Sequence, residues 1–234
     1  MTETDIDFLI NEAEIDSTAL VCSAQANQIG IQWLFAHGAG APMDSDFMNQ
    51  VAEGVAAAGI TVKRFEFPYM DERRKTGKKR PPNRAPELLQ HFMQAIEHAG
   101  GMSQCVIGGK SMGGRMASLL AAEHPNDVLG VVCLGYPFHP VGKLEKTRID
   151  HFPDMTVPHC VVQGTRDALG TREQVESYEL PSIVDVHWLE DGDHDLKPRK
   201  KSGLTHEAHI KSAINQVVGF ILSIDKNRKS SSEG

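Results

Sequence analysis

Short runs of apolar, β-branched residues alternate with stretches of helical periodicity along most of this chain, and no other feature constrains the fold as strongly. Strands that are separated by helix-length connections pair in parallel, and helices then cover both faces of the sheet. We therefore predict an α/β fold with a mostly parallel sheet. The expected strands are Ile6–Ile10, Ala19–Ala24, Ile31–Ala36, Thr61–Phe67, Gln104–Ile107, Leu129–Leu134, His159–Gln163 and Val184–Leu189.

The lengths of the connections add detail to this prediction. Only Gln25–Gly30 separates the second expected strand from the third, so we expect these two strands to form an antiparallel hairpin. With 234 residues, the chain suits one domain over residues 1–225, and we expect the polar tail 226–234 to be disordered. Helices are expected at Phe47–Ala58, Pro86–Ala99, Met112–Glu123, Arg172–Tyr178 and Thr205–Ile224.

Composition indicates a cytoplasmic protein. No apolar run approaches the roughly 20 residues that cross a bilayer, and the acidic start lacks the features of a signal peptide. A net charge of −7 makes nucleic acid a poor partner, so we expect neither a membrane nor a nucleic-acid partner. We expect buried, reduced thiols because the cysteines all lie inside expected strands: Cys22, Cys105, Cys133 and Cys160.

The pentapeptide Gly109-Lys110-Ser111-Met112-Gly113 fits G-x-S-x-G and joins an expected strand to an expected helix. A nucleophile elbow has this setting, because its serine occupies a strained turn where side chains two residues to either side would collide with strand and helix. Ser111 is therefore the candidate nucleophile. A phosphate-binding loop would need glycine at Gln104, and a dinucleotide-binding loop would need a different residue at Lys110 or Ser111.

A serine nucleophile needs a base that accepts its proton and an acid that orients the base. After such an elbow, the acid and then the histidine follow at the carboxyl ends of later strands. Asp167 follows the strand that ends at Gln163, and His194 follows the strand that ends at Leu189. We therefore predict a catalytic triad of Ser111, Asp167 and His194.

The segment Ala36-His37-Gly38-Ala39-Gly40 follows the third expected strand and is close to the H-G-G-G motif of esterases. We expect the backbone N–H groups of Ala39 and Met112 to form the oxyanion hole, with Gly40 as the substitute for Ala39. His37 is expected to hold this loop by hydrogen bonds beside the substrate.

Other histidines raise further possibilities. We expect His139 and Tyr136, which follow the sixth strand, to line the substrate pocket. Asp193 and Asp195 beside His194 invite a metal-site interpretation, but a calcium loop would need glycine and glutamate where Leu196 and Ser202 stand. The run 206–209 is one residue short of H-E-x-x-H. We predict neither a metal site nor a cofactor.

Together these stretches resemble the α/β-hydrolase superfamily, and more closely its small dienelactone-hydrolase-like branch. The resemblance implies a sheet of about eight strands and carries Ser111, Asp167 and His194 over as the triad. Dienelactone hydrolase itself has a cysteine nucleophile, so its lactone substrate does not transfer. The matching stretches are His37–Gly40, Gly109–Gly113, Tyr136–Pro140, Gly164–Asp167 and Gly192–His194.

The expected activity is hydrolysis of an ester or thioester bond in a small soluble substrate. The 22 residues Tyr136–Val157 are too few for the cap domain that larger relatives insert there, so we expect an open site. The branch is also similar to a chromatin-complex subunit, and a catalytically silent binding or scaffold protein is the alternative function. The sequence leaves the oligomeric state open.

Basic residues gather in three segments that follow expected strands, and we expect the first of them, Arg73–Arg84, to be a loop. Seven lie between Arg73 and Arg84, three between Lys143 and Arg148, and four between Lys197 and Lys201. If these segments ring the catalytic edge, they form a positive rim that favours anionic substrates. Lys78, Lys79 and Arg80 are its expected substrate-binding residues. The alternative is that they form an ordinary solvated surface.

Overall fold

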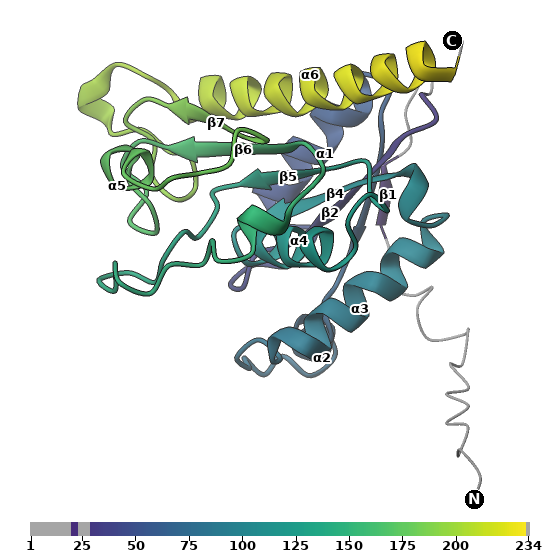
Figure 1. The fold of residues 1–234 in the computed structure, drawn as a ribbon. Helices are drawn as coiled ribbons and strands as arrows, with labels where there is room; N and C mark the ends of the chain where they lie inside the picture. Colours follow the sequence, from purple (N-terminus) through teal and green to yellow (C-terminus); the bar gives the residue numbers. More distant parts are fainter. Residues whose placement is uncertain (1–19, 23–28, 233–234) are drawn as a thin grey trace, which may run out of the picture.

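The computed structural model describes residues 20–22 and 29–232, so the expected strand Ile6–Ile10 lies outside the described residues. The described strands form one seven-stranded sheet in the order β1-β3-β2-β4-β5-β6-β7 (Figure 1). The pair β1–β3 is antiparallel and the other pairs are parallel. The strands are β1 (Leu20–Cys22), β2 (Gln32–Ala36), β3 (Thr61–Phe65), β4 (Cys105–Lys110), β5 (Gly130–Leu134), β6 (His159–Gly164) and β7 (Val184–Leu189).

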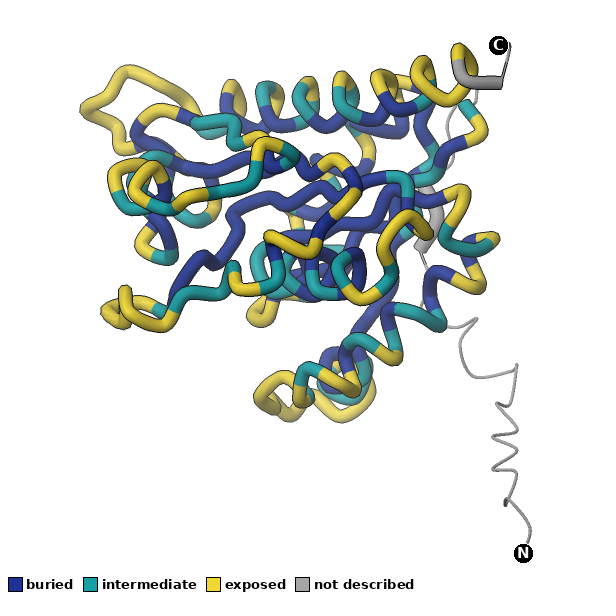
Figure 2. Tube along the Cα trace, in the orientation of Figure 1, coloured by how far each residue is buried: buried dark blue, intermediate teal, exposed yellow. Residues whose placement is uncertain are grey.

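Helices cover both faces of the sheet, as the alternating pattern predicts. On one face α1 (Asp46–Ala57) and α6 (His206–Ser232) bury apolar residues such as Val51 and Val217. On the other, α3 (Ala85–His98) and α4 (Met112–Glu123) do the same. The inner strands are continuous dark bands of buried residues in Figure 2, with exposed residues on the outer helix faces and loops. The remaining helices are α2 (Pro68–Thr76), α5 (Arg172–Glu176), η1 (Met102–Gln104), η2 (Phe152–Asp154) and η3 (Lys200–Ser202).

The expected hairpin between the second and third strands is wrong. Strand β1 pairs with β3, with Leu20 opposite Arg64, and β2 lies between β3 and β4. Both edges of β2 are occupied by parallel partners, so the outer edge of β3 is the place left for β1. Chain proximity favours a hairpin only where the neighbouring edge is free.

Helix α2 begins before the basic stretch that we expected to be a loop, and it includes residues 73–76. Pro68 occupies the first turn, where its missing N–H costs nothing. Gly77 ends the helix in the left-handed conformation at φ 69°. Inside the helix, the Lys75 ammonium pairs with Asp71 four residues earlier at 2.7 Å. The proline, the glycine and the ion pair therefore favour a helix here, although the segment is mostly polar.

The described part of the polar tail is helical, whereas we expected disorder from residue 226. Helix α6 continues through Ser232. Adding residues to an existing helix is much easier than nucleating one. An ion pair between Lys229 Nζ and Asp225 at 2.6 Å spans one turn of this extension.

The remaining fold expectations concern the connection after β5, the thiols and membrane helices. Residues 135–158 join β5 to β6 and contain only the short η2, so no cap domain is inserted there. Cys105, Cys133 and Cys160 are buried and unpaired, and the side chain of Cys22 lies outside the described residues. No described helix is both long and apolar enough to span a bilayer.

Candidate active site

Ser111 stands at the turn between β4 and α4. Its backbone has φ 52° and ψ −113°, a conformation that non-glycine residues avoid and that a nucleophile elbow imposes. The N–H of Ser111 donates to Leu134 O on β5 at 3.0 Å, and its carbonyl accepts from Arg115 N at 3.0 Å. Neighbouring elements therefore hold the strained residue in place.

The two motif glycines are required by close backbone approach. A Cβ atom on Gly109 would lie 2.4 Å from Gly113 C, and one on Gly113 would lie 2.6 Å from Ala36 O. Real Cβ atoms essentially never come so near to backbone atoms. The glycines let α4 start directly against β2 and β4, which projects the Ser111 side chain beyond the edge of the sheet.

Ser111, His194 and Asp167 form one hydrogen-bonded chain, as the order of the strand ends predicts. His194 Nε2 lies 2.8 Å from Ser111 Oγ, and His194 Nδ1 lies 2.8 Å from Asp167 Oδ2. Because the carboxylate accepts from Nδ1–H, Nε2 is left to accept the serine proton. The His194 side chain is 30% exposed, whereas Asp167 is fully buried.

The buried Asp167 carboxylate is held by donors on all sides. Leu169 N donates to Oδ1 at 2.8 Å, and Gln163 Nε2 donates to Oδ2 at 3.0 Å. Gln163 is itself fixed, because its Oε1 accepts from Tyr136 N at 2.7 Å. Sequence reasoning missed Gln163. The available signal was a lone amide at the end of an otherwise apolar strand, four residues before the acid.

The loop that carries His194 is tied to the elbow by Lys110, the second residue of the serine motif. Lys110 Nζ donates to His194 O at 2.5 Å, lies 3.3 Å from Asp195 Oδ1, and stands 5.5 Å from the centre of the Phe47 ring. Burial lowers the pKa of the Lys110 ammonium, and neighbouring carboxylates, Asp195 first, oppose that shift. Lys110 is therefore a further site residue that sequence reasoning missed.

Asp191 anchors the base of the same loop. Its carboxylate accepts from Arg199 N at 2.8 Å and Arg199 Nε at 2.7 Å, and Arg166 Nε lies 3.0 Å away. The hydrogen bond with Arg199 lowers the pKa of Asp191 to about 2. Asp191 and Leu196 have positive φ values of 56° and 62°, so non-glycine residues in a rare conformation bracket His194.

His37 holds the candidate oxyanion loop, as we expected. Its Nε2 accepts from Phe67 N at 3.0 Å, which leaves Nδ1–H to donate to Gly38 O at 2.7 Å. Burial lowers the pKa of His37 and so favours this neutral form. Tyr69, which sequence reasoning missed, donates its hydroxyl to Ala39 O at 3.0 Å. The carbonyl oxygens of Gly38 and Ala39 in this loop thus accept hydrogen bonds from side chains.

A cleft of about 360 Å³ opens between this loop and the residues Ser111 and His194. Met112 is the first residue of α4, so its N–H has no acceptor within the helix and can serve an oxyanion. Among the described residues, no three His, Cys, Asp or Glu side chains gather as metal ligands do. The cleft is lined by Gly38, Ala39, Gly40, Ala41, Ser45, Phe47, Met48, Lys110, Ser111, His194 and Asp195.

The structure does not place Tyr136 and His139 at the cleft. Tyr136 is fully buried and donates its hydroxyl to Arg148 O at 2.7 Å. His139 is also buried, and its ring nitrogens lie 2.9 Å from Pro140 O and 3.0 Å from Gln174 Oε1. Both side chains turn into the protein and hold loops together, so the expectation that they line the pocket is wrong.

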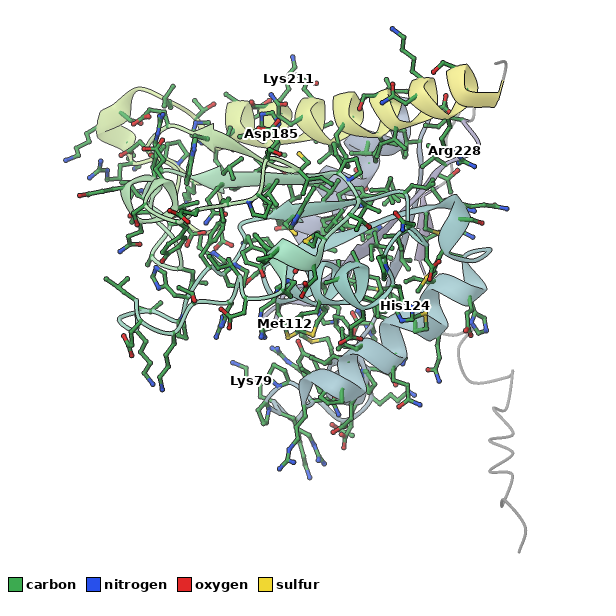
Figure 3. All side chains as sticks on the ribbon, in the orientation of Figure 1. Lys79, Met112, His124, Asp185, Lys211 and Arg228 are labelled. Atoms are coloured by element: carbon green, nitrogen blue, oxygen red, sulfur yellow. The ribbon has the colours of Figure 1, made fainter. Side chains whose placement is uncertain are left out.

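Lys78, Lys79 and Arg80 lie on the exposed segment between α2 and α3, where Figure 3 labels Lys79. None of the three is among the cleft's lining residues. The Arg80 guanidinium pairs with Glu72 at 2.6 Å. These side chains therefore do not line the cleft, and their attraction of an anionic substrate from a distance stays a prediction.

The chain is similar to known proteins in both sequence and structure. Residues 30–222 match a family model described as an alpha/beta hydrolase domain. A serine hydrolase homologue from Coxiella burnetii superposes with TM-score 0.62 at 15% identity, over 86% of this chain and 89% of that one. Dienelactone hydrolase from Anabaena variabilis gives TM-score 0.62 at 19% identity, over 85% and 89%.

A serine hydrolase without a lid from Xanthomonas campestris gives TM-score 0.61 at 15% identity, over 86% of this chain and 88% of that one. At these identities the likeness of the structures shows the fold alone. The family model, in contrast, shows the family. It matches more than half of the chain, including the elbow and the loops of Asp167 and His194. This chain belongs to the alpha/beta hydrolase domain family.

Proposed function

We propose that the protein is a serine hydrolase that cleaves ester or thioester bonds of small soluble substrates through an acyl-enzyme. The supporting observation is the hydrogen-bonded chain from Ser111 Oγ through His194 to Asp167, with both links at 2.8 Å. A serine that is only a helix cap has no need of a histidine that a buried carboxylate orients.

The proposed reaction follows from the positions of these groups. His194 Nε2 takes the Ser111 proton while Oγ forms a bond to the substrate carbonyl carbon. The backbone N–H groups of Ala39 and Met112 stabilise the oxyanion, and His194 then gives the proton to the departing alkoxide or thiolate. Water, deprotonated by His194, attacks the carbonyl carbon of the acyl-enzyme. The acid leaves, and His194 returns the proton to Ser111 Oγ. Asp167 stabilises the imidazolium in both halves.

The cleft supports a short acyl or alcohol group. Its volume of about 360 Å³ is near the lower end of ligand pockets. Phe47 and Met48 supply apolar surface, whereas Lys110 and Asp195 introduce charge. An open cleft of this size favours small, partly polar substrates over long lipid chains.

Fluorophosphonate labelling tests the proposal directly, because only an activated serine reacts. We expect the intact protein to be labelled at Ser111, as located by peptide mass spectrometry, and to hydrolyse p-nitrophenyl acetate. Ser111→Ala should fold normally, resist the probe and lose about 10³-fold or more in rate. An unlabelled, inactive wild type would instead favour the silent binding or scaffold protein.

A further inference from the structure

Arg115 lies on α4, one helical turn from the nucleophile, and a hydrogen-bond network links its backbone to that of Arg148. Arg115 N donates to Ser111 O at 3.0 Å, so the residue is attached about 6 Å along the helix from Ser111. Helical side chains lean toward the N-terminus of their helix, which here is the end that carries Ser111. Arg148 belongs to the connection after β5, on the same edge of the sheet.

A hydrogen-bond network fixes the two arginines relative to each other. Ser118 Oγ donates to Arg115 O at 2.9 Å and lies 3.4 Å from Tyr136 Oη. Tyr136 Oη in turn donates to Arg148 O at 2.7 Å. Both backbones are thus anchored to one buried serine–tyrosine pair. This contact also explains why Tyr136 is buried.

Neither guanidinium has an acidic partner in the described part of the chain. No carboxylate oxygen of those residues lies within 4.0 Å of either one. Other arginines of this protein do have an acidic partner, as Arg74 has Asp44 and Arg172 has Glu176. Arg115 Nε is in addition buried without any hydrogen-bond partner. A buried donor of this kind costs stability unless a ligand or ion engages it.

The surroundings leave the two positive charges uncompensated. Burial first, and the charge of Arg115 second, lower the pKa of Arg148. His151, whose Nε2 lies 2.8 Å from Ser118 Oγ, has its pKa lowered to about 4 by burial and then by Arg115, so it is neutral near pH 7. Asp150 and Asp154 act on His151 but are not among the charges that shift the pKa of Arg148. An anion would relieve the repulsion between the arginines.

We propose that Arg115 and Arg148, which lie outside the lining of the cleft, form a binding site for an anionic group at the far end of the substrate, a carboxylate or a phosphate. The inference rests on the proposed function and names its substrate class. Two planar guanidinium forks match the oxygen pairs of these anions, which exposed lysines on a flexible segment do not. The selective contact therefore lies at this arginine pair and not at Lys78, Lys79 and Arg80.

Binding to the Ser111→Ala protein tests the site without turnover. Calorimetry would use glutarate, inorganic phosphate and, as the uncharged analogue, glutaramide. We expect at least one anion to bind, and glutaramide not to bind. Arg115→Gln or Arg148→Gln in the same protein should weaken anion binding about tenfold or more, the factor for one charge-assisted hydrogen bond. Arg228→Gln, an exposed position near the end of α6 labelled in Figure 3, should change nothing.

Catalysis by the otherwise wild-type protein gives the second measurement. p-Nitrophenyl valerate and p-nitrophenyl hydrogen glutarate have equally long acyl chains and differ in a terminal carboxylate. Either glutamine variant should lower kcat/KM for the charged ester about tenfold or more and leave the neutral ester within about twofold. Arg115→Lys and Arg148→Lys, which keep the charge but not the fork, should fall between. These lysine variants also replace any glutamine variant that does not fold.

The outcomes separate this inference from the proposed function. Equal losses for both esters would show that the arginines are structural, and unchanged anion binding in the variants would overturn the site. Active enzyme with no preference for the charged ester would remove the anion site and leave the hydrolase. Arginine-dependent anion binding by a protein without any esterase activity would keep the site and remove the hydrolase.

Discussion

Replacing Asp167 with asparagine exchanges one carboxylate oxygen for an amide nitrogen at nearly constant volume. The carboxylate accepts three hydrogen bonds, from His194 Nδ1, Gln163 Nε2 and Leu169 N, at 2.8, 3.0 and 2.8 Å. The last two donors cannot turn away. Leu169 N–H belongs to the backbone, and the Gln163 amide is fixed by the N–H of Tyr136. Asparagine has one acceptor oxygen for these three donors.

Both orientations of the asparagine amide leave a donor facing a donor. With its oxygen toward His194, the NH₂ group opposes Leu169 N–H, the imidazole keeps its tautomer, and only the charge is lost. With its NH₂ toward His194, the group opposes Gln163, and the imidazole must accept at Nδ1, which puts its proton on Nε2. Losing a charge-assisted bond corresponds to about 10- to 150-fold in rate, and the wrong tautomer to about 10⁴-fold. We therefore expect kcat to fall by about 10- to 10⁴-fold.

The same conflict has a cost in stability. One buried donor left unsatisfied costs about 1–3 kcal/mol. In a domain of this size each kcal/mol lowers Tm by about 2–4 °C, so Asp167→Asn should melt about 2–12 °C lower. Asp185→Asn removes the same charge from an exposed position on β7, labelled in Figure 3, and should change neither quantity.

Steady-state hydrolysis of p-nitrophenyl acetate measures the catalytic effect, and calorimetric unfolding measures the Tm. KM should stay within about threefold, because Asp167 does not line the cleft. Suppose that Asp167→Asn retains kcat within about threefold of wild type while Ser111→Ala is inactive. The histidine would then need no buried carboxylate, and the role assigned to Asp167 would be wrong.

Three further predictions concern the surroundings of Ser111, His194 and Asp167. Lys110→Met removes the contact to the His194 loop and should lower kcat about tenfold or more. Tm should stay or rise, because burying an ammonium is costly. Unchanged steady-state kinetics would contradict the role of Lys110 in holding this loop. Gly113→Ala places a Cβ 2.6 Å from a backbone oxygen and should cost at least about 1–3 kcal/mol in urea unfolding. Gly219→Ala, with no atom within 4 Å, should gain up to about 1 kcal/mol. The bond from Arg199 lowers the pKa of Asp191 to about 2, so its stabilising contribution holds above the ordinary carboxylate pKa of about 4 and is lost as pH falls toward 2. Melting curves of Asp191→Asn should therefore vary less with pH across that range than those of wild type.

The arrangement of the triad could be predicted from the sequence because parallel strands end at one edge of a sheet. Once Asp167 and His194 follow strands β6 and β7, they must approach the elbow from the same side as Ser111. The bounds of α4 were also predictable, since the glycine motif marks where its strand ends and the helix begins. The glycine motif and the shared edge of the parallel strands were therefore enough to predict this part of the structure.

Strand neighbours and side-chain directions could not be read in the same way. Periodicity shows which residues of a strand are buried, but not which strand lies beside it, and so the pairing of β1 was missed. Tyr136 and His139 do follow β5, yet their side chains turn inward because Arg148 O and Gln174 supply partners from distant parts of the chain. A residue's place at a strand end does not fix which way its side chain turns.

Ion pairs could not be predicted from the sequence either, because a run of basic residues does not reveal which acidic residues lie beside it in the fold. Part of the expected rim is neutralised locally, since Arg80 pairs with Glu72 and Arg199 with Asp191. Arg115 belongs to none of the basic runs, yet after burial its charge is the next cause that lowers the pKa of Arg148. Neither arginine has an acidic partner in the described chain.

These two arrangements respond differently to salt. Attraction by exposed charges is screened as the Debye length falls from about 30 Å at 0.01 M to about 3 Å at 1 M, whereas contacts between partly buried charges are screened much less. A preference for the charged ester that survives high salt therefore belongs to Arg115 and Arg148. A preference that disappears belongs to the exposed rim around Lys78 and Lys79. The salt dependence of a single kcat/KM ratio thus distinguishes a built anion site from long-range steering.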